Sequence, residues 1–427
     1  MREMKDSGID WIGTIPQDWQ LSKIGSLYTQ RNEKVSDKDY QPLSVTMQGI
    51  LPQLATAAKT DDGDNRKLVR VGDFAINSRS DRRGSCGISP LDGSVSLINI
   101  ILTPRTAMHP GYYNWLFHTT LFADEFYKWG HGIVADLWTT RWQEMKSITV
   151  PVPEYAEQER IAAFLDAECA EIDTVLEKTR ASIEEYKKLK QAIITQAVTK
   201  GIRGDRPMKD SGIEWIGDIP AEWRKTQLRH CAAIKSGITL GKKYKKTDIL
   251  VERPYLRVAN VQDGYVDLSV LTTIEVTQDE DLKYRLRAGD VLMTEGGDRD
   301  KLGRGCVWHG EIEPCLHQNH IFAVQTSKDT LLPEFLEYLT VSDVGRSYFD
   351  VTAIKTTNLA CTSSSKVLAF TIPLPSVEEQ AEIVEALNTK CAGIDALVAK
   401  KQQYLTEIEN YKKSLIYEYV TGKKEVV

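Results

Sequence analysis

Two stretches of the chain carry the same hydrophobic pattern. From Leu165 onward, seam positions recur in alternating steps of four and three residues, and the same register returns 222 positions later from Leu387. A repeat of this kind over more than four heptads, flanked by charged residues, is typical of long helices that pack along a shared seam. The pattern predicts two helices of about 43 residues, or about 65 Å, each. Their expected contact positions are Leu165, Ile172, Leu176, Ile183, Ile193, Leu387, Ile394, Val398, Leu405 and Leu415.

Start and stop signals limit both helices. Pro153 and Pro375 precede the two patterns, and Gly201 and Gly422 follow them. The first helix leads away from the residues before it and the second returns, so we expect an antiparallel pair. Two unrelated amphipathic helices on separate cores are the alternative.

The segments before the helices have a strand-like pattern. Residues 21–149 and 226–371 are rich in Gly, Asp and β-branched residues, with short apolar runs broken by turn signals such as Asp263-Gly264. Each also has a helical stretch near its end. We therefore expect an α+β fold, in which two similar domains are joined by two long antiparallel coiled-coil helices. The expected limits are 1–152 for the first domain, 153–203 for the central helix, 204–375 for the second domain and 376–427 for the C-terminal helix.

The chain also repeats its sequence outside the helices. Residues 4–19, MKDSGIDWIGTIPQDW, return at 208–223 as MKDSGIEWIGDIPAEW. The block VPVPEYAEQERIAAFLDAECAEID from Val150 returns from Ile372 as IPLPSVEEQAEIVEALNTKCAGID. Between these matched ends the two middles diverge. The chain is therefore two half-molecules with a common frame and different middles.

Composition narrows the classes of function. The 427 residues include 54 Lys and Arg against 60 Asp and Glu, a net charge of −6. This balance excludes a uniformly basic nucleic-acid coat, but it allows a binder with local basic residues. No run of 18 apolar residues and no apolar N-terminal stretch occurs, so neither a membrane span nor a signal peptide is expected. Seven scattered cysteines favour a reduced, cytoplasmic protein.

Catalytic signatures are missing from the sequence. No complete phosphate-binding loop, base-methylation motif or nuclease motif is present. The only Cys/His cluster has spacings that match neither CxxC nor HxxxH, so buried or incidental residues are favoured over a zinc site. It comprises Cys306, His309, Cys315, His317 and His320. We expect no catalytic residue, metal or cofactor in this chain.

Positive charge gathers on turns in both middles. A basic loop follows Gly72-Asp73 in the first middle, and another follows Gly289-Asp290 in the second. Arg and Lys on such loops suit phosphate groups and guanine edges, whereas a solvated charged turn is the alternative for any one loop. The candidate DNA-binding residues are Arg79, Arg82, Arg83, Lys242, Lys243, Lys245, Lys246, Arg299, Lys301 and Arg304.

The doubled signature resembles one family. MKDSG-I-x-WIG-x-IP-x-x-W, followed each time by (V/I)P(V/L)P-x-x-x-EQ-x-x-I and a long helix, is similar to the specificity subunits of Type I restriction-modification systems from Met4 to about Lys423. The resemblance implies a non-catalytic subunit with two target-recognition domains, each reading half of a split double-stranded DNA sequence. It also implies two methyltransferase subunits and restriction-translocase subunits as partners, which would hold S-adenosylmethionine, ATP and Mg²⁺.

Two other classes of function remain open from the residues alone. One is a coiled-coil scaffold with two protein-binding domains, and the other is a self-sufficient DNA nuclease or methyltransferase. The tryptophans and prolines of the repeat are expected to pack as a supporting frame in any of these cases. They are Trp11, Pro16, Trp19, Trp215, Pro220 and Trp223.

Overall fold

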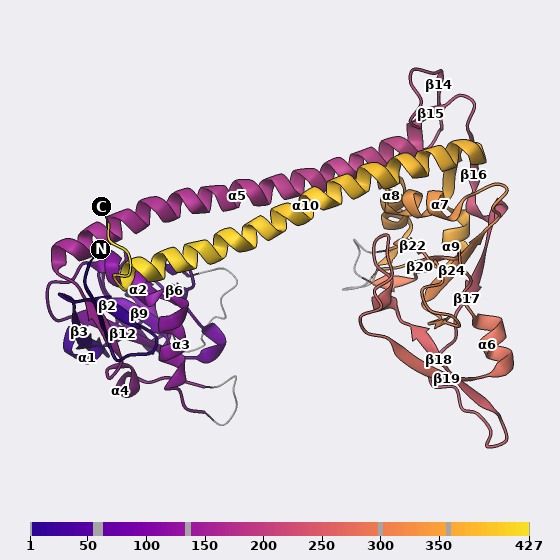
Figure 1. The fold of residues 1–427 in the computed structure, drawn as a ribbon. Coiled ribbons are helices and arrows are strands. Elements are labelled where there is room, and N and C mark those ends of the chain that lie inside the picture. Colours follow the sequence, from indigo (N-terminus) through magenta and orange to yellow (C-terminus); the bar gives the residue numbers. More distant parts are fainter. Residues whose placement is uncertain (1, 54–62, 133–137, 298–301, 356–359, 427) are drawn as a thin grey trace. The chain divides into compact units, whose positions relative to one another are not determined.

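The protein divides into two compact units, shown in Figure 1. The computed structural model describes residues 2–53, 63–132, 138–297, 302–355 and 360–426. Unit 1 contains Met1–Arg180 together with Gln402–Val427, whereas unit 2 contains Ala181–Lys401. None of the described helices is long and apolar enough to cross a membrane.

Unit 1 is built on a four-stranded antiparallel sheet. Its strands, in spatial order, are β10 (Cys86–Ile88), β9 (Phe74–Asn77), β12 (Asn99–Pro104) and β4 (Tyr28–Arg31). Every residue of β9 is buried, as expected for a central strand. The aromatic helices α2 (Pro110–Phe117) and α3 (Thr120–Lys128) contribute to the same core, in which the ring of Phe117 lies 4.5 Å from Phe74 and 4.7 Å from Phe122.

Smaller elements surround this sheet. A three-stranded sheet and a hairpin lie between β4 and β12 in the sequence, and short helices complete the unit. These elements are α1 (Ile24–Leu27), β5 (Lys34–Val35), β6 (Leu43–Thr46), β7 (Gly49–Pro52), β8 (Arg66–Val69), η1 (Ser80–Arg82), β11 (Gly93–Val95) and α4 (Trp142–Met145).

Unit 2 repeats the main sheet in the same order. Its strands are β22 (Gly305–Val307), β20 (Val291–Thr294), β24 (Ile321–Thr326) and β17 (Ala232–Ser236). The Gly-Asp pair before β9 and before β20 forms the same turn, because the Asp73 carboxylate accepts from the backbone N–H of Arg70 and the Asp290 carboxylate accepts from that of Arg287. The Gly72-Asp73 and Gly289-Asp290 pairs, which precede the two basic loops in the sequence, therefore lie in equivalent turns.

The remaining elements of unit 2 differ more from unit 1. The three-stranded sheet β19-β18-β23 is larger than its counterpart in unit 1. The elements are η3 (Leu228–His230), β18 (Leu250–Leu256), η4 (Val258–Asn260), β19 (Thr272–Thr277), α6 (Gln278–Tyr284), β21 (Gly296–Gly297), β23 (Leu316–His317), α7 (Pro333–Val341), α8 (Asp343–Thr352), β25 (Ile354–Lys355), β26 (Ala360–Cys361) and α9 (Ser364–Ala369).

The repeated sequence forms the same frame in both units. Each copy folds into a hairpin in one register, in which Met4 pairs with Pro16 and Met208 pairs with Pro220. The strand that follows each hairpin then pairs with the strand that leads into the long helix. The frame strands are β1 (Met4–Asp6), β2 (Thr14–Pro16), β3 (Gln20–Lys23) and β13 (Thr149–Val152) in unit 1, and β14 (Met208–Asp210), β15 (Asp218–Pro220), β16 (Arg224–Gln227) and β27 (Thr371–Leu374) in unit 2.

The two predicted long helices are present as α5 (Tyr155–Lys200) and α10 (Val377–Val420), and they run antiparallel. Unit 1 contains the first part of α5 and the last part of α10, whereas unit 2 contains the last part of α5 and the first part of α10. In unit 1, Leu165 of α5 and Leu415 of α10 belong to one hydrophobic core. In unit 2, Leu387 of α10 and Val198 of α5 do the same. The glycine after each helix has a positive φ, 74° at Gly201 and 71° at Gly422, the backbone conformation that often ends helices.

Candidate nucleic-acid interface and helix pair

The first basic loop leaves strand β9 and passes through the short helix η1. Arg79 lies 3.3 Å from the carboxylate of Asp81, and Arg83 pairs with Asp124. Arg82 lies 3.9 Å from Asp81 and keeps 69% of its side chain exposed. The loop therefore presents cations whose orientation is partly set by nearby acids, and exposed ion pairs of this kind are weak enough to exchange with a phosphate.

Two antiparallel backbone segments, at His131 and at Thr139, lie beside this loop in the first unit. Thr139 forms bridges with both Arg79 and His131, so three backbone segments lie side by side. Two aromatic side chains next to these segments are exposed, Trp129 at 48% and Trp138 at 41%. The second unit has the same arrangement, because β26 lies between β21 and β25. Each unit thus combines a basic loop with two adjacent antiparallel segments.

The second basic loop is described only in part. Arg299 and Lys301 lie outside the described residues, so the candidate contacts at these two positions stay predictions. Arg304 is half-buried, and its guanidinium donates to the side-chain oxygen of Gln262 at 3.3 Å. Arg304 is therefore held by the turn that contains Gln262.

The lysine-rich segment of unit 2, residues 242–246, is held at its first residues by contacts with Glu280. Lys242 and Tyr244 both contact the carboxylate of Glu280. Burial alone would raise the pKa of Glu280, but hydrogen bonds from Lys242, Thr277 and Tyr244 lower it to about 2. Lys243, Lys245 and Lys246 are exposed. Within the described residues, no hydrogen bond or ion pair joins this segment to Arg304.

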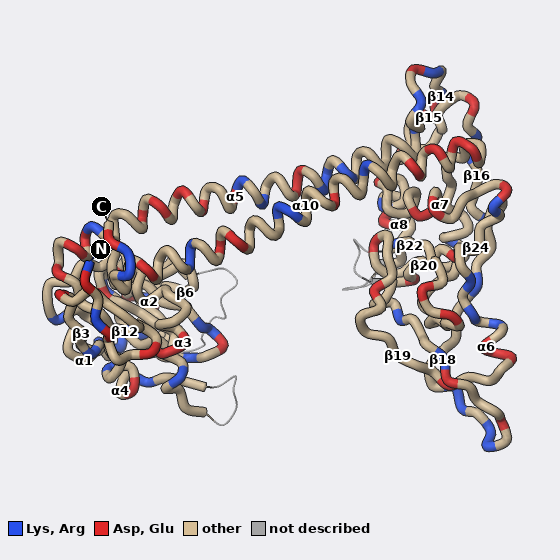
Figure 2. Tube along the Cα trace, in the orientation of Figure 1, with Lys and Arg blue, Asp and Glu red and all other residues tan. Residues whose placement is uncertain are grey.

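Lys and Arg are interspersed with Asp and Glu along the chain of each unit (Figure 2). This distribution agrees with the acidic net charge of the chain. Any basic surface must therefore be local, as the basic loops are.

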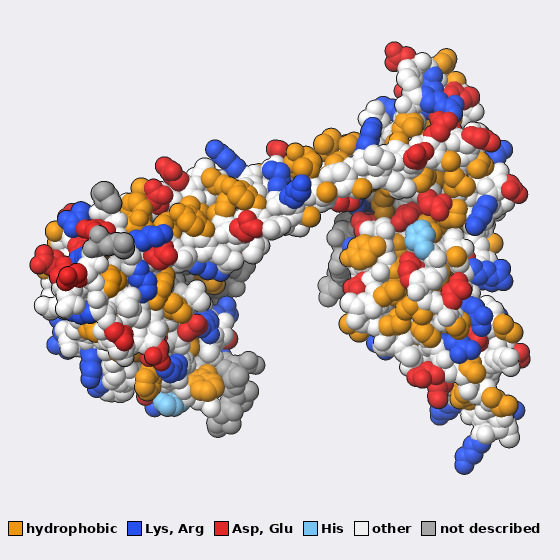
Figure 3. Space-filling view, in the orientation of Figure 1, with side chains coloured by type: hydrophobic (Ala, Val, Ile, Leu, Met, Phe, Trp, Pro, Cys, Tyr) orange, Lys and Arg blue, Asp and Glu red, His pale blue; other side chains and the backbone are white. Residues whose placement is uncertain are grey.

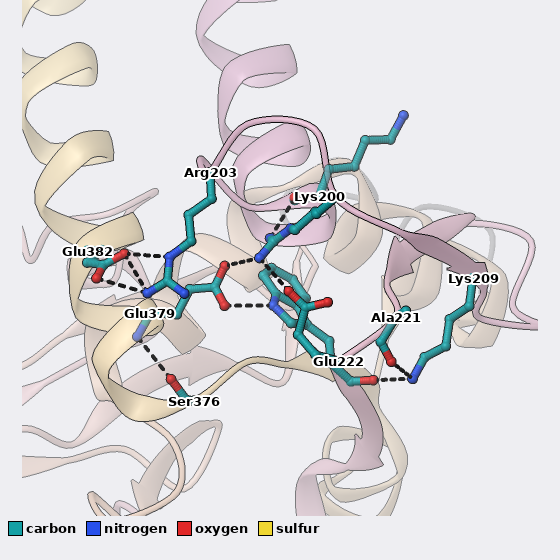
Figure 4. A network of polar contacts seen from close by, with 10 residues as sticks. Lys200, Arg203, Lys209, Ala221, Glu222, Ser376, Glu379 and Glu382 are labelled. Carbon is teal, nitrogen blue, oxygen red and sulfur yellow. Dashed lines mark hydrogen bonds and ion pairs between the residues drawn. The ribbon is translucent and has the colours of Figure 1, made fainter.

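A repeated cluster of charged and aromatic side chains, which was not predicted from the sequence, connects the frame to the helices. In unit 2, the Glu379 carboxylate accepts from Trp223 Nε1 at 2.9 Å and from Arg206 at 2.6 Å. The Arg206 guanidinium also lies over the Trp223 ring and pairs with Glu222 at 3.0 Å. Figure 4 shows Glu379 at the start of α10, beside the exposed pair of Arg203 and Glu382.

Unit 1 contains the same cluster at equivalent positions. The Glu157 carboxylate accepts from Trp19 Nε1 at 2.8 Å and pairs with Arg2, which also pairs with Asp18. The sequence signal was available, because Arg2 and Arg206 have the same 204-residue separation as the hairpin repeat, and Glu157 and Glu379 both lie in the repeated EQ pair.

The glutamine of each EQ pair connects its long helix to a helix of the domain. The Gln158 side chain accepts from the backbone N–H of His109, immediately before α2. The Gln380 side chain accepts from that of Leu332, immediately before α7. Both glutamines also donate to the backbone oxygen of the proline that precedes their helix. The repeated EQ pair therefore connects each long helix to the frame hairpin and to the domain helix.

The seam positions of the helix pair are all buried or half-buried. Leu165, Leu387 and Leu415 are at most 4% exposed. Ion pairs between the helices flank the seam: Lys412 with Asp173 at 2.6 Å in unit 1 and Lys190 with Asp395 at 2.7 Å in unit 2. The same seam thus continues through the portion of the helix pair that each unit contains.

Large apolar side chains are exposed along the helices at equivalent positions. Val175 and Leu397 are 222 residues apart, and each stands one residue before a seam position. Leu189 and Tyr411 are also 222 residues apart, and each stands one residue before the lysine of an ion pair between the helices. The exposed fractions of all these side chains range from 38% to 54%, and Tyr404 is exposed at the corresponding place one heptad before Tyr411. Figure 3 shows hydrophobic side chains exposed along the helix pair. These positions, which we call the apolar rows of α5 and α10, are candidate interaction surfaces.

The Cys/His cluster does not form a metal site among the described residues. No group of three His, Cys, Asp or Glu side chains suited to a metal occurs in that part of the chain. His317 lies on β23 at 1% exposure, and neither ring nitrogen has a hydrogen-bond partner. Burial lowers its pKa to about 4 from the usual 6.5, so the ring is neutral at pH 7.

This buried histidine predicts a pH dependence of stability in unit 2. A base whose pKa is lower in the folded state stabilises the fold fully above its unfolded pKa and loses that contribution as the pH falls through the folded value. The free energy of unfolding should therefore decrease from about pH 6.5 towards pH 4 because of His317. Denaturant unfolding of the protein and of His317→Leu at pH 7 and pH 4.5 measures this effect, and the variant should lose less stability between the two pH values.

Glu337 acts in the opposite sense and must be separated from His317. Burial raises the pKa of this carboxyl to about 7, so its protonation stabilises the fold as the pH falls from about 7 to 4.5. Glu337 is present in both the unmodified chain and His317→Leu. The difference between their losses of stability therefore removes the contribution of Glu337. An identical loss of stability in the unmodified chain and in His317→Leu would contradict the assignment to His317.

Comparison with known proteins identifies the architecture. A chain from a structure described as the basis of complex assembly and conformational transition of the type I R-M system has a TM-score of 0.72, with 16% identity and coverage of 96% of this chain and 99% of that one. The HsdS subunit from Thermoanaerobacter tengcongensis has a TM-score of 0.52, with 18% identity and coverage of 96% and 98%. The fold is therefore the α+β, two-domain, coiled-coil architecture of these subunits, as the sequence predicted.

No family model matches the chain. The curated proteins that resemble it in sequence are specificity subunits of type I restriction enzymes. The EcoKI specificity subunit of Escherichia coli is 23% identical over 96% of this chain and 90% of its own length. The EcoBI specificity subunit of Escherichia coli is 26% identical over 65% of this chain and 59% of its own. The MjaX relative of Methanocaldococcus jannaschii is 25% identical over about half of each chain. The chain is a relative of the specificity subunits of type I restriction enzymes, which confirms the predicted resemblance.

Proposed function

We propose that this chain is the non-catalytic subunit that reads a bipartite DNA target for a Type I restriction-modification complex. The observation that carries the proposal is the repeated frame, which holds a different basic loop in each unit at an equivalent place after β9 and after β20. Two different reading surfaces on one frame suit a target made of two different half-sites. A cytoplasmic location agrees with this role.

The partners belong to the same proposal. Two methyltransferase subunits would bind the exposed apolar rows of α5 and α10, and restriction-translocase subunits would join them. S-adenosylmethionine, ATP and Mg²⁺ would be held by those partners. The repeated positions of the apolar rows support two equivalent binding sites for methyltransferase subunits.

The test is methylation-site sequencing of DNA from cells that express the chain with its methyltransferase subunits. A split motif, methylated on adenine and dependent on this chain, would support the proposal. The isolated chain should transfer no methyl group and cleave no DNA. Turnover by the isolated chain would favour a self-sufficient enzyme, whereas no DNA binding even with partners would favour a protein scaffold.

The division of labour between the loops gives a sharper prediction. The double variant Arg82→Ala/Arg83→Ala should weaken or relax one half-site, and Arg304→Ala the other, because an arginine on guanine contributes about 1–3 kcal/mol of discrimination. The motif sequenced from each variant complex measures this effect. Variants of both loops that alter the same half-site would contradict the assignment of one loop to each half-site.

A further inference from the structure

A tight turn in unit 1 lies against the strand into which the basic loop leads. Strands β6 and β7 are joined by Met47 and Gln48, and Gly49 closes the turn with a φ of 105°. The Thr46 hydroxyl stabilises the turn, because it donates to the Gly49 backbone oxygen at 2.9 Å and accepts from the Gln48 N–H at 3.1 Å. Met47 is 67% exposed, and Gln48 is also exposed.

The packing of this turn leaves no room for a side chain. A Cβ atom at Gly87 of β10 would lie 2.9 Å from the Cα atom of Gly49. The two backbones are therefore in direct contact. The turn is fixed to β10, the strand into which the first basic loop leads, so its two exposed tip residues have a defined position beside that strand.

Unit 2 has a turn at the equivalent place. The Gln262 N–H donates to the Tyr265 backbone oxygen at 3.0 Å, and Gly264 has a φ of 77°. The Gly264 N–H donates at 3.3 Å to the oxygen of Gly305, which opens β22. This strand directly follows Arg304 of the second basic loop.

Two arginines from different elements meet the turn of unit 2. Arg304 donates to Gln262 at 3.3 Å, and Arg346 of α8 pairs with Asp263 at 3.1 Å. The Gln262 side chain also donates to the Ala259 backbone oxygen at 2.7 Å, so both of its ends are engaged. Tyr265 remains 59% exposed at the tip. Gln262 therefore positions Arg304, whereas Tyr265 is free to contact a ligand.

We propose that these two turns are specificity-determining elements, each adding base contacts to the half-site read by the basic loop of its unit. The inference rests on the proposed function, and its ligand is the major groove of double-stranded DNA. A glutamine amide can bond both the N6 and N7 groups of adenine, and apolar side chains contact the thymine methyl group. Gln48 and Met47 supply these contacts in unit 1. In unit 2 the Tyr265 ring supplies an apolar contact, and the positioned Arg304 suits a guanine edge.

The test in unit 1 uses the complex of the full chain with its methyltransferase subunits. Gln48→Ala should relax one base position of one half-site, with discrimination reduced roughly 10- to 100-fold. Gln48→Glu should shift the preference at that position from adenine towards cytosine, because a carboxylate accepts from the cytosine amino group. A new preference cannot result from unfolding. Val71→Ala, at an exposed site beside the glycine turn at the opposite end of β10, is the matched control and should leave the motif unchanged.

The test in unit 2 separates contact from positioning. Tyr265→Ala should change only the other half-site, whereas Leu282→Ala, an equally exposed apolar position on α6, should change neither. Gln262→Ala should relax the same base position as Arg304→Ala, and the double variant should show little further loss, because the two side chains act as one.

The possible outcomes distinguish this inference from the proposed function. Gln48 and Tyr265 variants with the original motif and methylation rate would overturn the inference while leaving DNA reading by the chain intact. An unmodified complex that methylates no defined motif would overturn the proposed function, and the role of the turns with it. Loss of discrimination confined to one half-site for each turn would support both.

Discussion

Replacement of Glu379 by glutamine should destabilise unit 2 by about 3 kcal/mol or more, because it leaves the Arg206 guanidinium without its buried partner. Glu379 is 2% exposed, and only 11% of the Arg206 side chain is exposed. The amide introduced by this substitution would keep the shape of the side chain and could still accept from Trp223. The more exposed Glu222 would still pair with Arg206, so the loss would report removal of the buried carboxylate charge and not a cavity.

Two matched variants test this explanation. Glu382 also lies on α10, and it pairs with Arg203 through side chains that are both about half exposed. Glu382→Gln should therefore lower the free energy of unfolding by less than about 1 kcal/mol. Glu157→Gln, the equivalent change in unit 1, should have an intermediate effect, because the side chains of Arg2 and Glu157 are 20% and 13% exposed. Urea unfolding of the three variants measures how much free energy of unfolding each one loses, and so gives the order of the three losses. Equal losses for Glu379→Gln and Glu382→Gln would show that burial of the charge is not the cause.

The second large effect is expected on assembly. Tyr404→Glu combined with Tyr411→Glu should remove one of the two methyltransferase subunits from the complex. A buried aromatic anchor contributes at least about 2 kcal/mol, or about a 30-fold change in affinity, for each residue. The glutamates would add the cost of an unpaired charge inside the interface. Light scattering of the reconstituted complex measures the change from two bound subunits to one.

The control for assembly lies on the same helix. Thr406→Glu adds the same charge at an exposed position away from both the seam and the apolar row, and it should leave two subunits bound. Leu189→Glu with Leu397→Glu, in unit 2, should remove the other subunit. Retention of two subunits by both double variants would place the methyltransferase sites elsewhere on the chain.

The sequence predicted the features that depend on local periodicity and repetition. The heptad pattern identified α5 and α10, and the repeated MKDSG segment identified the frame of both units. The Arg206–Glu379 contact was missed, because its partners are 173 residues apart and only the fold brings them together. The two turns could not be found either, because they share little more than a glutamine and a glycine at different offsets. The acids that pair with Arg79 and Arg83 were likewise visible only in the structure.

The composition of unit 1 has a consequence for biosynthesis. Its core includes Leu415 and Val420, and the Tyr112 hydroxyl donates to the Val420 backbone oxygen at 2.8 Å. Unit 2, by contrast, is formed by one continuous segment, Ala181–Lys401. As the ribosome releases the chain from its N-terminus, unit 2 has all of its residues before unit 1 does. The half of the protein that is translated first is therefore the last to be completed, and a released chain that ended at residue 401 would contain all of unit 2 but lack the last part of α10 that the core of unit 1 requires.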